Sequence, residues 1–146
     1  MSSFFLNKQI SKTKAKKRAY AAFSIYHRTL WTLKGFVPCY TCDKHVVLKG
    51  KPGARVMVGH WVEGHTDATY VNEAYVRPQC FVCNIMMGGN QGEFRDRIRK
   101  ELGNEAVDIL LARSKMSVKY SASEYIQKEQ YYKEKLKLIS KNALDK

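Results

Sequence analysis

Four cysteines in two matched pairs constrain this chain more than any other feature of its sequence. They form Cys39-x-x-Cys42 and Cys80-x-x-Cys83, and the sequence contains no further cysteine. Each pair presents two thiolates at the spacing that binds one side of a tetrahedral zinc ion, so the two pairs supply four ligands for a closed structural site. Because the stretch between the pairs is long, we expect zinc to clamp an inserted hairpin and loop rather than a short finger.

Other interpretations of the cysteines explain less. Two unrelated pairs of buried cysteines would leave the matched spacing unexplained, and a redox-active pair would be expected within a thioredoxin-like βαβ pattern, which surrounds neither pair. No apolar run approaches the roughly 18 residues of a membrane helix, and Phe4-Phe5-Leu6 is too short for a signal peptide. We therefore expect a cytoplasmic protein, in which cysteines bind metal rather than form disulfides.

The charge of the chain is strongly positive and unevenly distributed. The 146 residues include 26 lysines and arginines and 13 aspartates and glutamates, a formal net charge of +13, and no acidic residue precedes Asp43. Nucleic acid is the commonest partner of such a chain, although a basic surface that only aids solubility is the alternative. The residues predicted to contact nucleic acid are Lys12, Lys14, Lys16, Lys17, Arg18, Asn90, Arg95 and Arg99.

Hydrophobic spacing predicts an α+β, mostly helical chain with three consecutive parts. Residues 1–34 form a basic N-terminal helical arm, with a helix from about Ser11 to Leu33 that ends at the Gly35–Pro38 segment. Residues 35–103 form a zinc-stapled core, and residues 104–146 form a C-terminal helical region.

Local signals place the shorter elements within these parts. Strands are expected at His45–Leu48, Arg55–Val58 and Tyr70–Val76, the last of them stopped by Pro78. Helices are expected at Phe81–Met87, from a cap at Asn90 to Leu102, and from a cap at Asn104 to about Arg113. Ser121 and Glu124 have the spacing of a capping box, which predicts a final helix to about Lys141.

His60, Asn72 and Asn84 are the candidate catalytic residues. Gly59-His60 ends an apolar strand, Asn72 lies in the returning strand, and Asn84 follows the last cysteine at the start of a helix. A strand end can hold an imidazole beside a helix-borne amide oxygen. The imidazole can take a proton from water near neutral pH, and the amide oxygen can bind a hard cation such as Mg²⁺. This order of elements looks like the ββα-metal, or His-Me finger, unit of HNH nucleases.

Each of these residues also has an ordinary structural interpretation. A lone histidine beside Trp61 is more often packed or exposed without function, and a lone asparagine at a helix start is usually a cap. Their placement relative to the cysteines favours the functional interpretation. His27, His45 and His65 lack that placement and are interpreted as structural or surface residues.

From about Pro38 to Ile139 the chain is similar to the NinG (Rap) recombination proteins of lambdoid phages. The motifs that carry the resemblance are Pro38-Cys39-x-x-Cys42, Gly59-His60-Trp61, Asn72-Glu73, Gln79-Cys80-x-x-Cys83-Asn84, Gly89-Asn90, Phe94-Arg95 and Gly103-x-Glu105-Ala106-Val107-Asp108. The resemblance implies a structure-specific endonuclease that acts on branched double-stranded DNA such as Holliday junctions and D-loops, in the host cytoplasm if the chain is phage-encoded. It leaves the N-terminal arm unexplained.

The resemblance also implies roles for single residues. His60 would be the general base, Asn84 would bind the catalytic Mg²⁺ or Mn²⁺, and Asn72 would orient the loop that carries His60. The phage endonuclease VII resolvases also look similar, but they have an acid before the catalytic histidine where this chain has Gly59. Glu73 is therefore the candidate second metal ligand, with Glu63 and Asp67 as alternatives in the loop.

One further departure concerns Met86-Met87, which stand where NinG-like chains usually carry a basic residue. Two other functions also fit the sequence. A non-catalytic zinc module that binds DNA would keep the charge and the cysteines but give His60 and Asn84 no role. A phage-encoded adaptor would instead bind a protein through the C-terminal helices. A homodimer is expected if the chain resolves junctions, because two strands must then be cut.

Overall fold

The protein is described by a computed structural model that covers residues 10–144, so the Phe4-Phe5-Leu6 segment lies outside the described part. The chain forms two compact units. One unit combines two helices, α2 (Lys12–Trp31) and α5 (Ala122–Leu144). The boundary between the units falls after Leu30, so only the last residue of α2 belongs to the other unit. The other runs from Trp31 to Val118 and contains all four cysteines. The predicted division at residues 34 and 103 differs from this one, because two helices distant in the sequence pair with each other.

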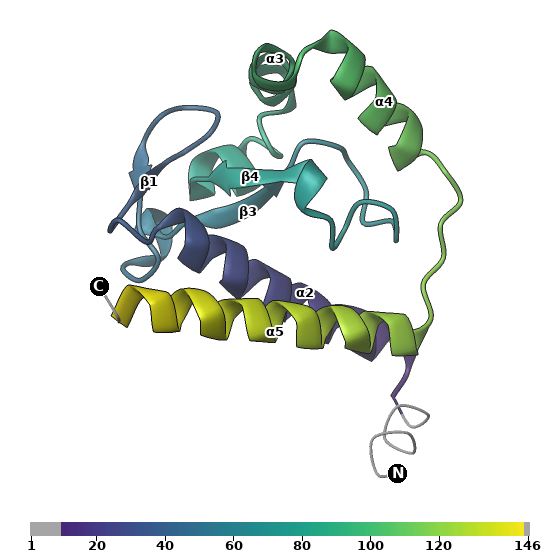
Figure 1. Ribbon diagram of the computed structural model, residues 1–146. Coiled ribbons are helices and arrows are strands. Elements are labelled where there is room, and N and C mark those ends of the chain that lie inside the picture. The colour runs from purple at the N-terminus through teal and green to yellow at the C-terminus, as the bar shows by residue number, and fades with distance from the viewer. Residues whose placement is uncertain (1–9, 145–146) are drawn as a thin grey trace. The chain divides into compact units, whose positions relative to one another are not determined.

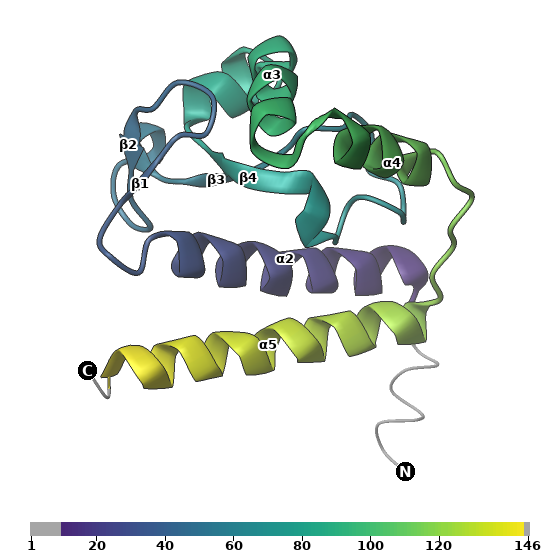
Figure 2. The ribbon, with the colours of Figure 1, turned by 45° about the horizontal axis from the view of Figure 1, so that its top comes forward.

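The first unit is a pair of helices that run side by side (Figures 1 and 2). Small and aromatic residues recur on one face of α2 at helical spacing, so this face is buried: Ala15, Ala19, Ala22, Phe23 and Tyr26. The Tyr132 ring of α5 packs edge-on against Phe23, with ring centroids 5.1 Å apart. The predicted helix from about Ser11 to Leu33 is confirmed to within two residues at each end.

The start of α5 confirms the predicted capping box. The Ser121 hydroxyl accepts a hydrogen bond from the Glu124 backbone N–H at 3.1 Å, and the Glu124 carboxylate accepts one from the Ser121 backbone N–H at 3.3 Å. These reciprocal bonds satisfy N–H groups that the first helical turn leaves without intrahelical partners.

The second unit contains two small antiparallel sheets of two strands each. In the first, β1 (Val37–Pro38) pairs with β2 (His45–Val46), and the first cysteine pair lies in the connecting turn. In the second, β3 (Met57–His60) pairs with β4 (Val76–Gln79), so that His60 lies opposite Val76. The second cysteine pair follows β4 directly.

Two predictions about the strands are wrong. Residues 70–75 do not form a strand; they form a turn and the short 3₁₀ helix η2 (Glu73–Tyr75), and β4 begins only at Val76. Pro78 does not stop the strand but lies inside it. Proline is tolerated there because each strand of a two-stranded sheet is an edge, where one side of the backbone needs no donor.

Helical elements complete the second unit. The turn η3 (Val82–Met86) is followed by α3 (Gln91–Leu102) and α4 (Asn104–Ser114). Asn90 precedes α3 as predicted, but it does not cap the helix. Its backbone is left-handed, with φ at 49°, and its side chain makes no capping hydrogen bond. The sequence also predicts that Asn104 caps α4, and this is wrong by one residue. Asn104 is the first residue of α4, and Gly103 occupies the cap position.

The second unit has two hydrophobic clusters. One surrounds the cysteines and includes Val46 and Val56, with Trp31 packed against it. The other is built on the fully buried Trp61, which packs with residues of η2, α3 and α4: Tyr75, Phe94, Ile98 and Val107. Because Trp61 follows His60, this cluster fixes the end of β3. None of the helices within residues 10–144 combines the length and the apolar composition that a membrane span requires.

Candidate functional site

The four cysteines, distant in sequence, are brought together by the two sheets. Their sulfur atoms all lie within 4.8 Å of one another, and the Cys42 and Cys80 Sγ atoms are 3.7 Å apart. Tetrahedral zinc with bonds of about 2.3 Å separates its sulfur ligands by about 3.8 Å. The cluster therefore has the donor chemistry and the spacing of a structural zinc site.

The electrostatics of the cluster also suit a cation. Burial would raise the pKa of the Cys39 thiol, but hydrogen bonds from the Thr41 hydroxyl and from backbone groups outweigh burial and lower the pKa to about 6. Burial raises the pKa of Cys42 to about 12, and the neighbouring thiols contribute to this rise. Without a cation the four sulfur atoms cannot all ionise together, whereas zinc would stabilise every thiolate.

A charged network ties the first cysteine turn to α3. The Arg97 guanidinium contacts the Asp43 carboxylate at 2.9 Å and the Tyr40 carbonyl oxygen at 3.1 Å. The Tyr40 hydroxyl donates to Glu101 at 2.7 Å, and Arg77 of β4 contacts the same carboxylate at 2.8 Å. This network holds the cysteine turn, β4 and α3 together, and so fixes the position of the elements that carry the second half of the site.

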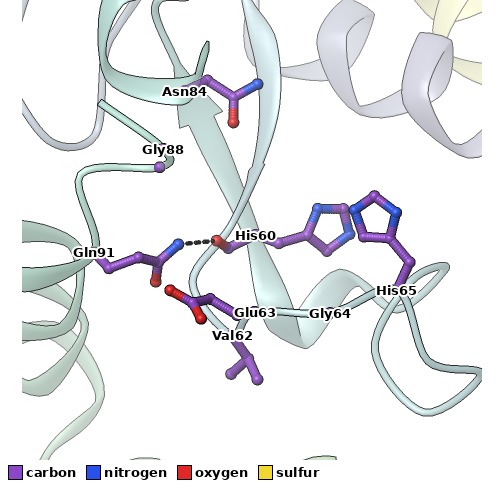
Figure 3. Close-up of a pocket in the computed structure, with 9 residues that line it drawn as sticks. His60, Val62, Glu63, Gly64, His65, Asn84, Gly88 and Gln91 are labelled. Carbon is purple, nitrogen blue, oxygen red and sulfur yellow. Dashed lines mark hydrogen bonds between the residues drawn. The ribbon is translucent and has the colours of Figure 1, made fainter. Parts of the chain in front are cut away.

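A pocket of about 270 Å³ lies beside the end of β3 (Figure 3). Its walls come from β3, the loop after it, η3 and the start of α3. The lining residues are His60, Val62, Glu63, Gly64, His65, Asn84, Gly88, Gly89 and Gln91. The structure thus brings together His60 and Asn84, two of the three predicted catalytic residues.

His60 is held in one orientation by the backbone of the loop that follows it. Its Nε2 atom lies 2.9 Å from the Tyr70 carbonyl oxygen. A carbonyl oxygen only accepts hydrogen bonds, so Nε2 must carry the proton, and the lone pair of the neutral ring is on Nδ1. Burial lowers the pKa of His60, the Tyr70 carbonyl partly offsets this effect, and nearby His65 lowers it further. His60 is therefore neutral, and able to accept a proton, at neutral pH.

Asn72 braces the segment that presents the Tyr70 carbonyl. Its Nδ2 atom donates to the Ala68 carbonyl oxygen at 3.2 Å, and its Oδ1 atom accepts from the Ala74 N–H at 3.0 Å. Asn72 does not line the pocket. Its contacts are those of a residue that positions the loop and, through Tyr70, the His60 ring.

Asn84 lies in η3, where the sequence predicts a short helix, and this helix is a single turn of π-helix. The turn is defined by the hydrogen bond from the Met87 N–H to the Val82 carbonyl oxygen at 2.8 Å. Such widened turns often occur at functional sites. The Asn84 Nδ2 atom faces the Met57 sulfur at 3.7 Å, and its amide oxygen is directed towards the pocket (Figure 3).

The three candidate carboxylates are placed differently. Glu63 lines the pocket, whereas Asp67 and Glu73 are not among the lining residues, and Glu73 is exposed in η2. An acid at position 59 is excluded by packing, because a Cβ atom on Gly59 would lie 2.6 Å from Gln79 Cδ. Gln79 cannot move away, since it is fully buried and its Nε2 atom donates to both Thr41 Oγ1 and the Gly89 carbonyl oxygen.

Sequence reasoning missed two residues of this pocket. His65 is a lining residue rather than an isolated surface histidine, and its ring stacks on Tyr70 with centroids 4.6 Å apart. Gln91 donates from Nε2 to the His60 carbonyl oxygen at 3.0 Å, and its buried Oε1 atom has no hydrogen-bond partner within the described residues. No sequence signal marks Gln91, whereas a second histidine five residues after His60 is a weak one.

The predicted nucleic-acid contacts fall into three groups. Lys12, Lys14, Lys17 and Arg95 are exposed on helices, and Lys16 is partly exposed. Arg18 and Arg99 form ion pairs, with Glu129 at 3.1 Å and with Asp108 at 3.0 Å. The Asn90 Nδ2 atom lies 3.7 Å from the Cys83 sulfur, beside the cysteine cluster.

These features define a small basic protein of mixed helices and short sheets, with four cysteines placed to bind zinc and a pocket between the end of β3 and η3. The chain belongs to the NinG family, since the family described as Bacteriophage Lambda NinG protein matches residues 37–142. This membership connects the chain with phage recombination. Searches of curated proteins and of solved structures give no match.

Proposed function

We propose that this protein is a metal-dependent DNA endonuclease of the His-Me finger type that hydrolyses phosphodiester bonds in branched recombination intermediates. The observation that carries the proposal is the shared pocket of His60 and Asn84. In this pocket, β3 supplies the neutral imidazole of His60, with its lone pair on Nδ1, and η3 supplies the amide oxygen of Asn84. Family membership and the net charge of +13 support DNA as the substrate.

In the proposed reaction, His60 Nδ1 removes a proton from a water molecule as that water attacks the phosphorus atom. The bond from phosphorus to the 3′ oxygen breaks, which leaves a 5′-phosphate and a 3′-hydroxyl. A bound Mg²⁺ or Mn²⁺ would polarise the phosphate and stabilise the leaving oxygen. The Tyr70 carbonyl, braced by Asn72, keeps the ring oriented and stabilises the imidazolium that forms.

We propose Asn84 and Glu63 as the protein ligands of this metal, with Glu63 in place of Glu73. Asn84 and Glu63 both line the pocket. Mg²⁺ prefers oxygen ligands, keeps several waters and commonly uses only one or two carboxylates together with substrate phosphates. The pocket supplies donors of this kind.

The direct test is cleavage of four-way junction, three-way junction, flap and linear duplex DNA with Mg²⁺. We expect wild-type protein to cut the branched substrates, and His60→Ala to lose about 10²–10⁴-fold in rate with unchanged zinc content and DNA binding. His45→Ala is the matched control, because His45 is exposed and lies outside the pocket. Wild-type-like cleavage by His60→Ala would contradict the proposal.

A non-catalytic DNA-binding zinc module is the second candidate. The cysteine cluster and the basic charge support it without involving the pocket. It predicts tight, salt-dependent DNA binding with no metal-dependent cleavage of any substrate in the panel.

A further inference from the structure

The end of the turn that carries Asn84 presents three consecutive, largely exposed apolar side chains to solvent. Ile85 is 53% exposed, Met86 70% and Met87 54%. The turn is nevertheless well fixed. Met87 N–H donates to the Val82 carbonyl oxygen at 2.8 Å, and Gly89 N–H donates to the carbonyl oxygen of the buried Cys83 at 2.9 Å. A fixed, exposed group of apolar side chains is a feature of binding surfaces rather than of the ordinary protein surface.

Its position relates this apolar turn, Ile85–Met87, to the pocket. Asn84 and Gly88, the residues on either side of it in the sequence, both line the pocket (Figure 3). A second protein seated on the turn would therefore cover an edge of the pocket and hinder the entry of a substrate. Two copies of this chain would also bring together like net charges of +13. The occupant that fits is the substrate itself.

The chemistry of the turn limits which part of DNA it can bind. Phosphates offer no apolar surface to an isoleucine or to methionine thioethers, and sugars and thymine methyl groups offer only small ones. The broad apolar surfaces of DNA are its base faces, which a stacked duplex hides. Proteins that insert isoleucine, leucine or methionine between bases bind DNA where the stack is opened, and in duplex DNA this opening costs free energy at each step. At a branch point the bases are already partly unstacked, so the cost is smaller than in linear duplex.

We infer that Ile85, Met86 and Met87 form a wedge that packs against unstacked bases at the branch point of DNA and so selects branched over linear substrates. This inference rests on the proposed function, since it places the branch point next to the scissile phosphate in the pocket. The wedge also explains why Met86 and Met87 stand where NinG-like chains usually carry a basic residue, since a surface that contacts bases needs apolar side chains rather than a charge for phosphate.

The test measures binding separately from cleavage. Affinities for a four-way junction and for linear duplex of the same length are determined without divalent metal, and a 2-aminopurine base at the branch point reports unstacking by its fluorescence. We expect Met86→Ser/Met87→Ser to lose on the order of tenfold or more of the junction preference, from the apolar burial of one or two side chains. Its affinity for linear duplex should be unchanged, and its fluorescence increase should be absent.

Two controls accompany this variant. Met116→Ser changes another exposed methionine, 63% exposed and outside the pocket, and should behave as wild type. Met86→Leu/Met87→Leu keeps an apolar surface and should retain the preference. Zinc content and circular dichroism verify folding.

The possible outcomes separate the two proposals. A serine variant with the full junction preference, while wild-type protein cuts junctions, would overturn the wedge alone. A serine variant that changes from dimer to monomer would also overturn it, because the turn would then be a subunit interface. Wild-type protein that neither prefers nor cuts junctions would overturn the proposed function, and the wedge with it.

Discussion

At the scale of single residues, Gly59 limits where the pocket can obtain a carboxylate. Any side chain at this position would meet Gln79, which is fully buried and held by hydrogen bonds to Thr41 and Gly89. A carboxylate therefore cannot precede His60 in β3, and Glu63 in the following loop is the acidic residue that reaches the pocket.

This packing predicts that Gly59→Ala destabilises the protein. We expect a loss of about 1–3 kcal/mol in the free energy of unfolding, the usual cost of overpacking a well-packed site, measured by urea denaturation. Gly53→Ala is the matched control, because a Cβ atom there meets nothing within 4 Å. Equal stability of the two variants would contradict the close approach of Gln79 to β3.

The proposed role of His60 as general base predicts that replacing His65 changes the pH dependence of cleavage. A general base must be neutral, so the rate should fall as pH drops through the pKa of His60, which burial and His65 hold below its usual value. His65→Ala removes a nearby charge and admits water, and both effects raise the pKa of His60. We therefore expect the acidic limb of the pH–rate profile to move to higher pH in His65→Ala. An acidic limb that stays in place would indicate that another group controls it.

At the scale of elements, the helices and the cysteine cluster were predictable, whereas the strands were predictable only in part and the π-helical form of η3 was not. The strands β2 and β3 overlap the expected strands at His45–Leu48 and Arg55–Val58, but β4 does not begin where the third strand was expected. Ser121 and Glu124 predict the start of α5 because a capping box depends only on residues close together in the sequence. The matched cysteine pairs predict a metal site because their spacing is also a local signal. Strands of two to four residues are too short to show alternation. Their pairing depends on tertiary contacts, which is why β4 contains Pro78 and begins after the predicted strand.

For the candidate site, the sequence predicted the proximity of His60 and Asn84, which line one pocket. It did so because the order of elements around the cysteines is visible in the sequence. Gln91 and the role of the Tyr70 carbonyl were not predicted, because both act through backbone atoms brought together by folding. The π-helical hydrogen bond of η3 likewise has no sequence signature.

The helix pair of α2 and α5 predicts a stability that depends on pH. Burial, followed by the charge of Lys135, lowers the pKa of His27 to about 4. In the unfolded chain the pKa of His27 is about 6.5. Between these two pKa values the unfolded chain binds a proton that the folded protein does not, so protonation favours unfolding. The stabilising contribution is complete above about pH 6.5 and is lost as pH falls towards 4.

We therefore expect wild-type protein to lose more stability than His27→Phe between about pH 7 and pH 4.5. The variant keeps a ring against Phe23 and Tyr132 but cannot titrate. The difference between the two proteins, measured by urea denaturation at each pH, cancels the titration of the carboxylates that both share. Parallel losses of stability would show that the pKa of His27 is the same in the folded and unfolded states, and would contradict this prediction.

At the scale of the whole molecule, the two compact units predict separable responses to metal removal. The four cysteines and both tryptophans, Trp31 and Trp61, belong to the unit of residues 31–118. In structural zinc sites the binding energy is folding energy. We expect a chelator to release one zinc per chain and shift the tryptophan emission to longer wavelength, while the α2–α5 pair retains part of the helical circular dichroism. Unchanged emission after zinc release would mean that the cysteine cluster does not hold this unit together.

For the proposed DNA substrate, the net charge of +13 predicts binding that depends on salt, and the placement of the lysines on α2 makes the prediction specific. The first turn of α2 contains no acidic residue, although acids there would stabilise the helix through its dipole. Lys12, Lys14 and Lys17 are exposed on α2, where their charges can reach a phosphate backbone. Replacing Lys12, Lys14 and Lys17 with glutamine should weaken junction binding and reduce the slope of log affinity against log salt by roughly 2 to 3, the value for three phosphate contacts.

The control for this prediction replaces Lys44, Lys49 and Lys51, which are exposed in the other unit, and removes the same number of charges. If net charge alone attracted DNA, the two triple variants would bind equally well. If α2 contacts phosphates directly, only the first variant loses the steep slope, because counterions are released only where a phosphate is neutralised. Cleavage at saturating protein should be unchanged in the first variant, since none of its three lysines lines the pocket. A lower rate at saturation with intact affinity would place α2 in the chemistry rather than in binding.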